Sequence, residues 1–169
     1  GDVMSYWPRP TTADIGLRAF SNSPNNLMVE AALGMQNILL DDESNSNINE
    51  HLRHNSQWNV SIDCEEDEFF YDLLLLKWLD EILYRSEIHQ QWFVDGQVIV
   101  GHSNGKLNLQ AQVSWIDCEL ITREIEIKAV TSHKLKFEQV SQNQEISSKW
   151  PEVPSFQGPG WFCDVIFDI

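Results

Sequence analysis

Acidic side chains stand at matching places near the two ends of the chain. Asp14 lies in a run, residues 12–20, in which apolar and other side chains alternate, and Asp168 lies in a second alternating run, residues 163–169. Both runs predict β-strands. If the strands pair, Asp14 and Asp168 would face each other, and such like charges repel unless a cation lies between them. Carboxylate oxygens suit a hard ion such as Ca²⁺ or Mg²⁺. The alternative is that both are ordinary solvent-facing strand residues.

Lys128 is a second candidate, in the run EIEIKAV. The alternation predicts that Lys128 shares the polar face of a strand with Glu124 and Glu126. A lysine there could pair with the two aspartates or contact a phosphate of a partner. The competing interpretation is an exposed cross-strand ion pair of little energetic value. His133 falls on the apolar positions of the same strand, which is typical of a hydrogen-bonded core histidine rather than of a ligand.

Other motifs that carry chemistry are missing from the sequence. It has no P-loop, GxGxxG or GxSxG pattern. The acidic run DDESNSNINE lacks the glycine that an EF-hand loop requires at its sixth position. His51 and His54 have a ligand-like spacing, but no third ligand is near in sequence, so a zinc site is not expected.

The elements that must position these residues predict one α+β domain over residues 1–169. Two principal helices are expected to pack on a largely antiparallel sheet. Ser23 and Pro24 predict the start of the first helix as its N-cap and first residue. Residues 67–86 predict the second helix, whose apolar residues cover most of its circumference and should be buried on more than one side.

The segments between these elements are expected to be less regular. Residues 1–10 are expected to be irregular or derived from a tag, and the polar run 41–57 is expected to form a mobile acidic loop. Asp95–Gly96 is a turn signal inside a strand pattern.

Composition limits the classes of function. The 26 acids against 11 lysines and arginines give a formal charge of −15, which disfavours direct binding of nucleic acid and suits a basic partner or a cation. No apolar run approaches the roughly 20 residues of a membrane span. Three scattered cysteines predict no disulfide framework, so a reducing, cytoplasmic compartment is expected. We expect a monomer or weak oligomer without membrane contact.

Three separated stretches together resemble the archease family. They are TTADIGLRAF near the N-terminus, EIKAVTSH in the second half and VIFDI at the C-terminal end. Between them, MVEAALGMQNILLDD and DLLLLKWLDEILY resemble the two helices of the family in position and character. The likeness extends from about Thr12 to Ile169. The chain departs from the family pattern at Thr11, where a histidine is usual, and at Ser132, where an aromatic residue is usual.

The resemblance implies a cytoplasmic α+β protein that is not itself an enzyme. Archeases assist the GTP- and metal-dependent tRNA-splicing RNA ligase by promoting its guanylylation and multiple turnover. By matching position, Asp14, Asp168 and the terminal carboxylate of Ile169 would bind a divalent metal ion, Ca²⁺ or Mg²⁺ with Mn²⁺ as a further candidate. Lys128 would be the ligase-activating lysine. RNA would be contacted only indirectly, through the ligase.

Two other functions stay open from the sequence. The family resemblance also admits a chaperone or adaptor of a tRNA-modifying enzyme, such as a methyltransferase, without a role for metal. A hydrolase that uses paired carboxylates is the third alternative, although the sequence shows neither a pocket nor a perturbed acid for it.

Overall fold

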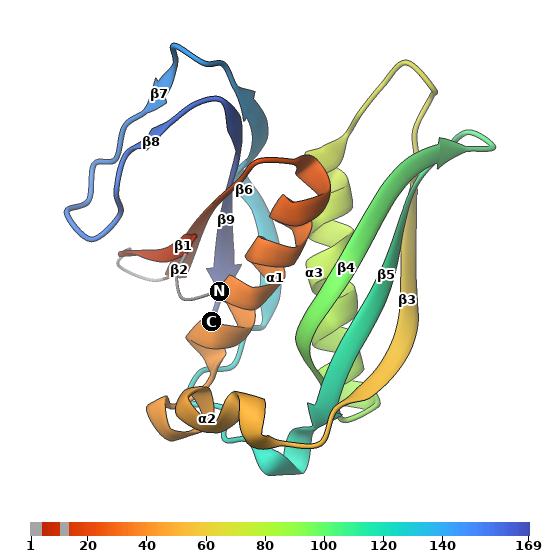
Figure 1. Cartoon of the computed structure of the whole chain (residues 1–169), viewed down its shortest axis with the longest axis vertical. Helices are drawn as coiled ribbons and strands as arrows, with labels where there is room; N and C mark the ends of the chain where they lie inside the picture. The colour runs from red at the N-terminus through yellow and green to blue at the C-terminus, as the bar shows by residue number, and fades with distance from the viewer. Residues whose placement is uncertain (1–4, 11–13) are drawn as a thin grey trace.

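Two antiparallel β-sheets enclose a layer of helices in the computed structural model of the chain (Figure 1). The structure describes residues 5–10 and 14–169, with the side chains of residues 9 and 10 excepted. The helical elements are α1 (Pro24–Leu39), α2 (Asp42–Asn47), the 3₁₀ turn η1 (Ile48–Glu50), α3 (Tyr71–Ile88) and the 3₁₀ turn η2 (Cys118–Leu120). The strands are β1 (Tyr6–Pro10), β2 (Asp14–Ser21), β3 (His54–Asp63), β4 (Gln91–Ser103), β5 (Lys106–Asp117), β6 (Ala129–Val140), β7 (Glu145–Ile146), β8 (Phe156–Gln157) and β9 (Gly160–Asp168).

The strands form a four-stranded sheet in the order β1-β2-β9-β6, a three-stranded sheet in the order β3-β5-β4 and a short β7-β8 ribbon. The predicted α+β class and antiparallel pairing are confirmed. The prediction of one sheet carrying two helices was too simple, because two larger sheets and three α-helices are present among the described residues. Alternation shows which face of a strand is apolar, but it does not show which strands share a sheet.

Helix α1 begins as predicted. The Ser23 hydroxyl accepts a hydrogen bond from the Asn26 N–H at 3.1 Å, and Pro24 is the first helical residue. The helix packs on β2 and on β4, and so contacts both sheets (Figure 1). At Gly34 an added Cβ would lie 2.8 Å from the Leu17 side chain, so this glycine permits the close approach of α1 to β2.

Helix α3 confirms the prediction that it is buried on more than one side. It contacts β6 of one sheet and β3 and β4 of the other. Its Trp78 side chain is fully buried, and the indole N–H donates to the Met28 carbonyl of α1 at 3.1 Å. A helix enclosed on several sides needs apolar residues around most of its circumference, which explains the sequence LLLLKWL at its centre.

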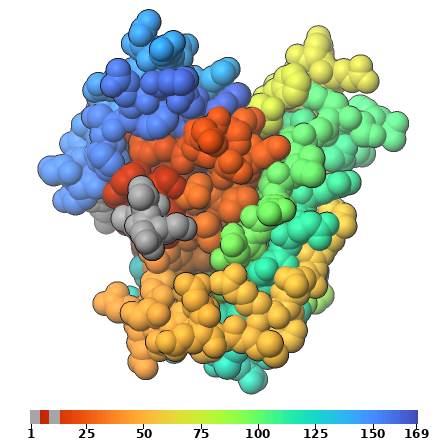
Figure 2. All heavy atoms as spheres, in the orientation of Figure 1, coloured from red at the N-terminus to blue at the C-terminus, as the bar shows by residue number. Residues whose placement is uncertain are grey.

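Residues 41–57 are not the loop that their polarity predicts. They contain α2, η1 and the first residues of β3. The Asp41 carboxylate caps α2 by accepting a hydrogen bond from the Ser44 N–H at 2.8 Å, and the Ser44 hydroxyl accepts one from the Thr122 N–H at 2.8 Å. The segment forms a continuous part of the protein surface in the space-filling view (Figure 2, light orange). Capping and tertiary hydrogen bonds order a sequence that lacks an apolar stripe.

Residues 1–10 and 123–128 also differ from their predictions. Tyr6–Pro10 forms an edge strand rather than an irregular segment, while residues 1–4 lie outside the described part. The run before Ala129 is not strand, so β6 begins later than the alternation indicates. The Glu124 N–H instead donates to the Leu39 carbonyl at 2.7 Å, which satisfies the C-terminal end of α1.

The hairpin of β4 and β5 turns at a place that the sequence analysis missed. Asp95–Gly96 lies at a register shift within β4, so this turn signal marks a β-bulge and not a reversal. The chain reverses at Asn104 and Gly105, which have φ angles of 55° and 72°. Asn-Gly with both residues in the left-handed region is the preferred two-residue hairpin turn.

All three cysteines are buried as free thiols, as the absence of a disulfide framework predicts. Burial raises the pKa of Cys118 to about 11 and raises the pKa of Cys163 above its ordinary value.

Within residues 5–10 and 14–169, no helix is both long enough and apolar enough to span a membrane.

Candidate functional site

The register of β2 and β9 sets the two candidate aspartates opposite each other. The strands are antiparallel neighbours, and Asp14 pairs with Asp168 as a register partner. Side chains directly opposite in an antiparallel pair lie on the same face, with Cβ atoms about 4.5–5.5 Å apart. The pairing of these strands, which the sequence left as a condition, is present in the structure. Asp14 is half-buried and Asp168 is exposed, so both carboxylates gather at one end of the sheet, near water.

Lys128 lies beside this acid pair. Strand β6 pairs with the other edge of β9, where Ala129 is the register partner of Asp168, and the Lys128 N–H donates to the Asp168 carbonyl at 2.7 Å. Lys128 is exposed and forms no ion pair with any described residue. The competing interpretation, an exposed cross-strand ion pair of Lys128, is therefore not found among the described residues.

The carboxylate oxygens of the acid pair are ligands of the kind that a hard divalent cation binds. Two carboxylates on neighbouring strands supply negative charge to one point, and they would repel each other less with a cation between them. No group of three or more histidine, cysteine, aspartate or glutamate side chains able to hold a metal occurs in the described part of the chain. A cation here would rest on two side chains, with main-chain, solvent or partner oxygens completing the site. Ile169 directly follows Asp168 and is 39% exposed.

Two further positions bear on this site. Thr11, which stands where the archease pattern has histidine, lies outside the described residues. His133 is exposed and belongs to a four-residue bulge in β6, between the paired residues Thr131 and Lys136. The bulge breaks the alternation, so the prediction of a core histidine at 133 was wrong.

His54 belongs to β3, where its ring stacks on Trp115 at 4.5 Å between ring centroids.

A buried ion pair on the same sheet face was missed by the sequence analysis. Arg18 and Asp164 are register partners four residues along the two strands from the acid pair. The guanidinium donates from Nε and Nη2 to the two carboxylate oxygens at 2.7 and 2.8 Å. Its Nη1 donates to the Ser147 carbonyl at 3.1 Å. Arg18 lies on the polar side of its strand's alternation, yet its side chain is only 9% exposed and contacts the Ser147 carbonyl of the segment between β6 and β9.

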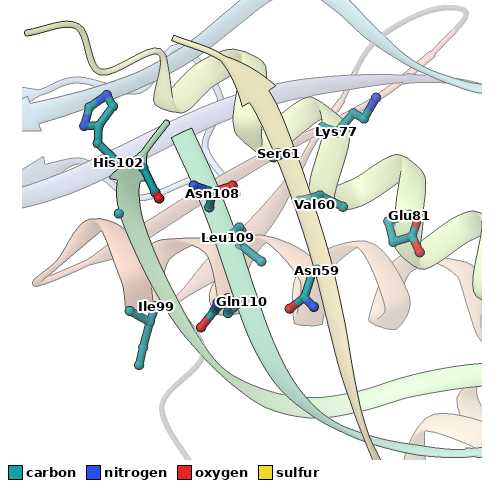
Figure 3. Close-up of a pocket in the computed structure, with 12 residues that line it drawn as sticks. Asn59, Val60, Ser61, Lys77, Glu81, Ile99, His102, Asn108, Leu109 and Gln110 are labelled. Atoms are coloured by element: carbon teal, nitrogen blue, oxygen red, sulfur yellow. The ribbon is translucent and has the colours of Figure 1, made fainter. Parts of the chain in front are cut away.

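A separate hollow of about 720 Å³ is lined by residues of the three-stranded sheet and of α3 (Figure 3). Uncharged polar side chains of β3 and β5 line it, with Asn59, Asn108 and Gln110 among them, while Lys77 and Glu81 come from α3. Neither the acid pair nor Lys128 takes part in it. We therefore place the candidate functional site at the end of β2 and β9.

A match to a family model shows to which protein family the chain belongs. The model of the Archease protein family (MTH1598/TM1083) matches residues 6–169. The chain belongs to the archease family. Protein archease of Methanosarcina mazei is 31% identical over 161 residues, which cover 94% of this chain and 91% of that relative. Protein archease of Pyrococcus furiosus is 25% identical over 144 residues, which cover 84% of this chain and 94% of the relative.

The archease fold is also evident in a solved structure. The solution structure of protein 1598 of Methanobacterium thermoautotrophicum superposes with a TM-score of 0.63, covering 99% of this chain and 100% of that protein at 21% identity. At that identity the likeness shows a shared fold. Because the family match covers residues 6–169, it includes β2, β9 and Lys128 just before β6, and so all the candidate residues.

Proposed function

We propose that this chain is a protein cofactor of the GTP-dependent tRNA-splicing RNA ligase and promotes the guanylylation and turnover of that enzyme. Membership of the archease family supports the proposal. The observation that carries it is the register pairing of Asp14 with Asp168, with Lys128 bound through its main chain to the same strand. On this proposal the chain acts on its partner and has no reaction of its own.

The two aspartates would hold a divalent cation, with the carboxylate of Ile169 as a third oxygen donor. Bound there, the cation would supply positive charge to phosphate oxygens at the partner's active site. Lys128 is exposed and forms no ion pair with a described residue. Its ammonium group could therefore contact the partner or a phosphate without first breaking such a pair. The acidity of the remaining surface suits a partner whose nucleic-acid-binding surface is basic.

The test is single-turnover guanylylation of the cognate ligase with and without this protein. Asp168→Asn removes one charge of the pair with little change of shape, and it should abolish most of the acceleration. Asp95→Asn is the matched control, because Asp95 is an exposed strand residue of the other sheet and the asparagine can still accept the hydrogen bond of the Gly96 N–H. Absence of acceleration by the wild type would refute the cofactor role.

The same assay separates the alternative function. If Asp168→Asn accelerates guanylylation as well as the wild type does, the carboxylates have no metal role and the chain acts as an adaptor. Thermal unfolding in Ca²⁺, Mg²⁺ or Mn²⁺ gives an independent reading, because a cation held by the acid pair raises the unfolding temperature of the wild type more than that of Asp168→Asn.

A further inference from the structure

A cavity of about 710 Å³ lies between the four-stranded sheet and the segment that joins β6 to β9. It is on the same face of the sheet as Arg18 and Asp164 and is distinct from the acid pair at the strand ends. The volume is in the range of pockets that bind small molecules, roughly 300–1,000 Å³. The lining residues include four cations, Arg18, Lys134, Lys136 and Lys149, against three acids, Glu138, Glu145 and Asp164.

This net positive lining contrasts with the rest of the molecule, whose formal charge is −15. Lys134, Lys136 and Lys149 are exposed and form no ion pair with any residue that the structure describes. With acids more than twice as numerous as lysines and arginines, a lysine has many acids to pair with. Three unpaired ammonium groups around one cavity therefore indicate a place for an external anion.

The backbone of β6 is distorted where it supplies two of these lysines. Between Thr131 and Lys136 the strand carries four residues opposite a single residue of β9. Lys134 lies in this bulge with φ 54°, a left-handed conformation that is unfavourable for a side chain with a Cβ. Bulges redirect side chains, and strained backbone is concentrated at binding sites. Here the bulge supplies Lys134 to the lining of the cavity.

The third lysine is positioned by the buried ion pair. Arg18 has its Nε and Nη2 engaged by Asp164, and its Nη1 donates to the Ser147 carbonyl at 3.1 Å. This last bond fixes the chain two residues before Lys149 against the sheet. All three nitrogens of the guanidinium thus donate hydrogen bonds within the protein. The three lysines are the cationic groups of the lining that could bind a ligand.

We propose that this cavity binds an oligophosphate anion through the ammonium groups of Lys134, Lys136 and Lys149. Lysine ammonium groups act as point charges that suit a flexible phosphate chain. The lining has one more cation than acids in a chain of formal charge −15, which favours an anionic ligand over a neutral one. This site goes beyond the proposed ligase-cofactor role and needs neither the ligase nor the acid pair to be demonstrated.

Calorimetric titration of the full chain with inorganic tripolyphosphate, in metal-depleted buffer, tests the site. We expect saturable binding by the wild type and a loss of affinity of roughly tenfold for each lysine removed, about hundredfold in Lys136→Gln/Lys149→Gln. Lys77→Gln/Lys106→Gln is the matched control, because both of its lysines are exposed on other elements and the net charge changes equally. All four positions are exposed, so the variants should fold, as circular dichroism will show.

Two results would overturn the proposal: no saturable binding by the wild type, or an equal loss of affinity in the two double variants. A parallel titration with a nucleoside triphosphate identifies the source of the phosphate chain, because tighter binding than tripolyphosphate shows that base and sugar contribute. Failure of this experiment leaves the guanylylation assay unaffected, and the converse also holds.

Discussion

Replacing Arg18 by methionine should destabilise this protein far more than replacing an exposed cation. The side chains of Arg18 and Asp164 are 9% and 5% exposed, and their two hydrogen bonds measure 2.7 and 2.8 Å. Arg18→Met leaves the Asp164 carboxylate buried without the guanidinium. Removing one partner of a buried ion pair lowers the free energy of unfolding by roughly 3–5 kcal/mol. With a urea m-value of about 2 kcal/mol/M, the midpoint should fall by roughly 2 M.

The assay is equilibrium unfolding in urea, followed by tryptophan fluorescence and circular dichroism. Lys106→Met is the control, since its ion pair with Asp63 at 2.9 Å is largely exposed, and its midpoint should change little. The double variant Arg18→Met/Asp164→Leu should recover most of the loss, because the charge that remained buried is also removed. A midpoint for Arg18→Met equal to that of the control would refute the reasoning. So would a double variant no more stable than the single one.

Three further predictions concern the helical layer and the buried thiols. Ser23→Ala removes the acceptor of the Asn26 N–H and should lower the free energy of unfolding by about 1 kcal/mol, measurable by urea unfolding. Gly34→Val adds a side chain where even a Cβ meets Leu17 at 2.8 Å, so overpacking of roughly 1–3 kcal/mol is expected in a thermal melt, and an unchanged melt would contradict the packing of α1 on β2. Cys118, whose pKa burial raises to about 11, should resist iodoacetamide in the folded protein at pH 8 and react once urea unfolds it, as mass spectrometry will show.

Local signals predicted local structure well. The Ser23–Pro24 start of α1 was readable because capping depends on a few adjacent residues. The alternation around Asp14 and Asp168 predicted two strands and the faces of those two side chains, and the structure supplies the pairing and the register. The acid pair was therefore within reach of the sequence.

Tertiary context set the features that the sequence did not reveal. Helix α2 has no apolar stripe, and the hydrogen bond between Ser44 and Thr122, distant in the chain, fixes it. The polar position of Arg18 is buried and contacts the Ser147 carbonyl of the segment between β6 and β9, which no periodicity within β2 can indicate. The bulge around Lys134 likewise depends on where β9 lies. The lysine cavity was invisible for this reason, since its walls come from three separate segments.

The central position of β9 has a consequence for how the molecule is made. β9 comes after every other strand along the chain, yet it lies between β2 and β6 and supplies both their inner hydrogen bonds and one half of the acid pair. Its contacts with β2 join residues as many as 154 positions apart, from Asp14 to Asp168. Such long-range pairing forms late and slowly. While residues 160–168 are still in the ribosome, β2 and β6 each have an unpaired edge, and Asp14 is the one member of the acid pair that is present. Insertion of β9 therefore closes the sheet and assembles the site in a single event.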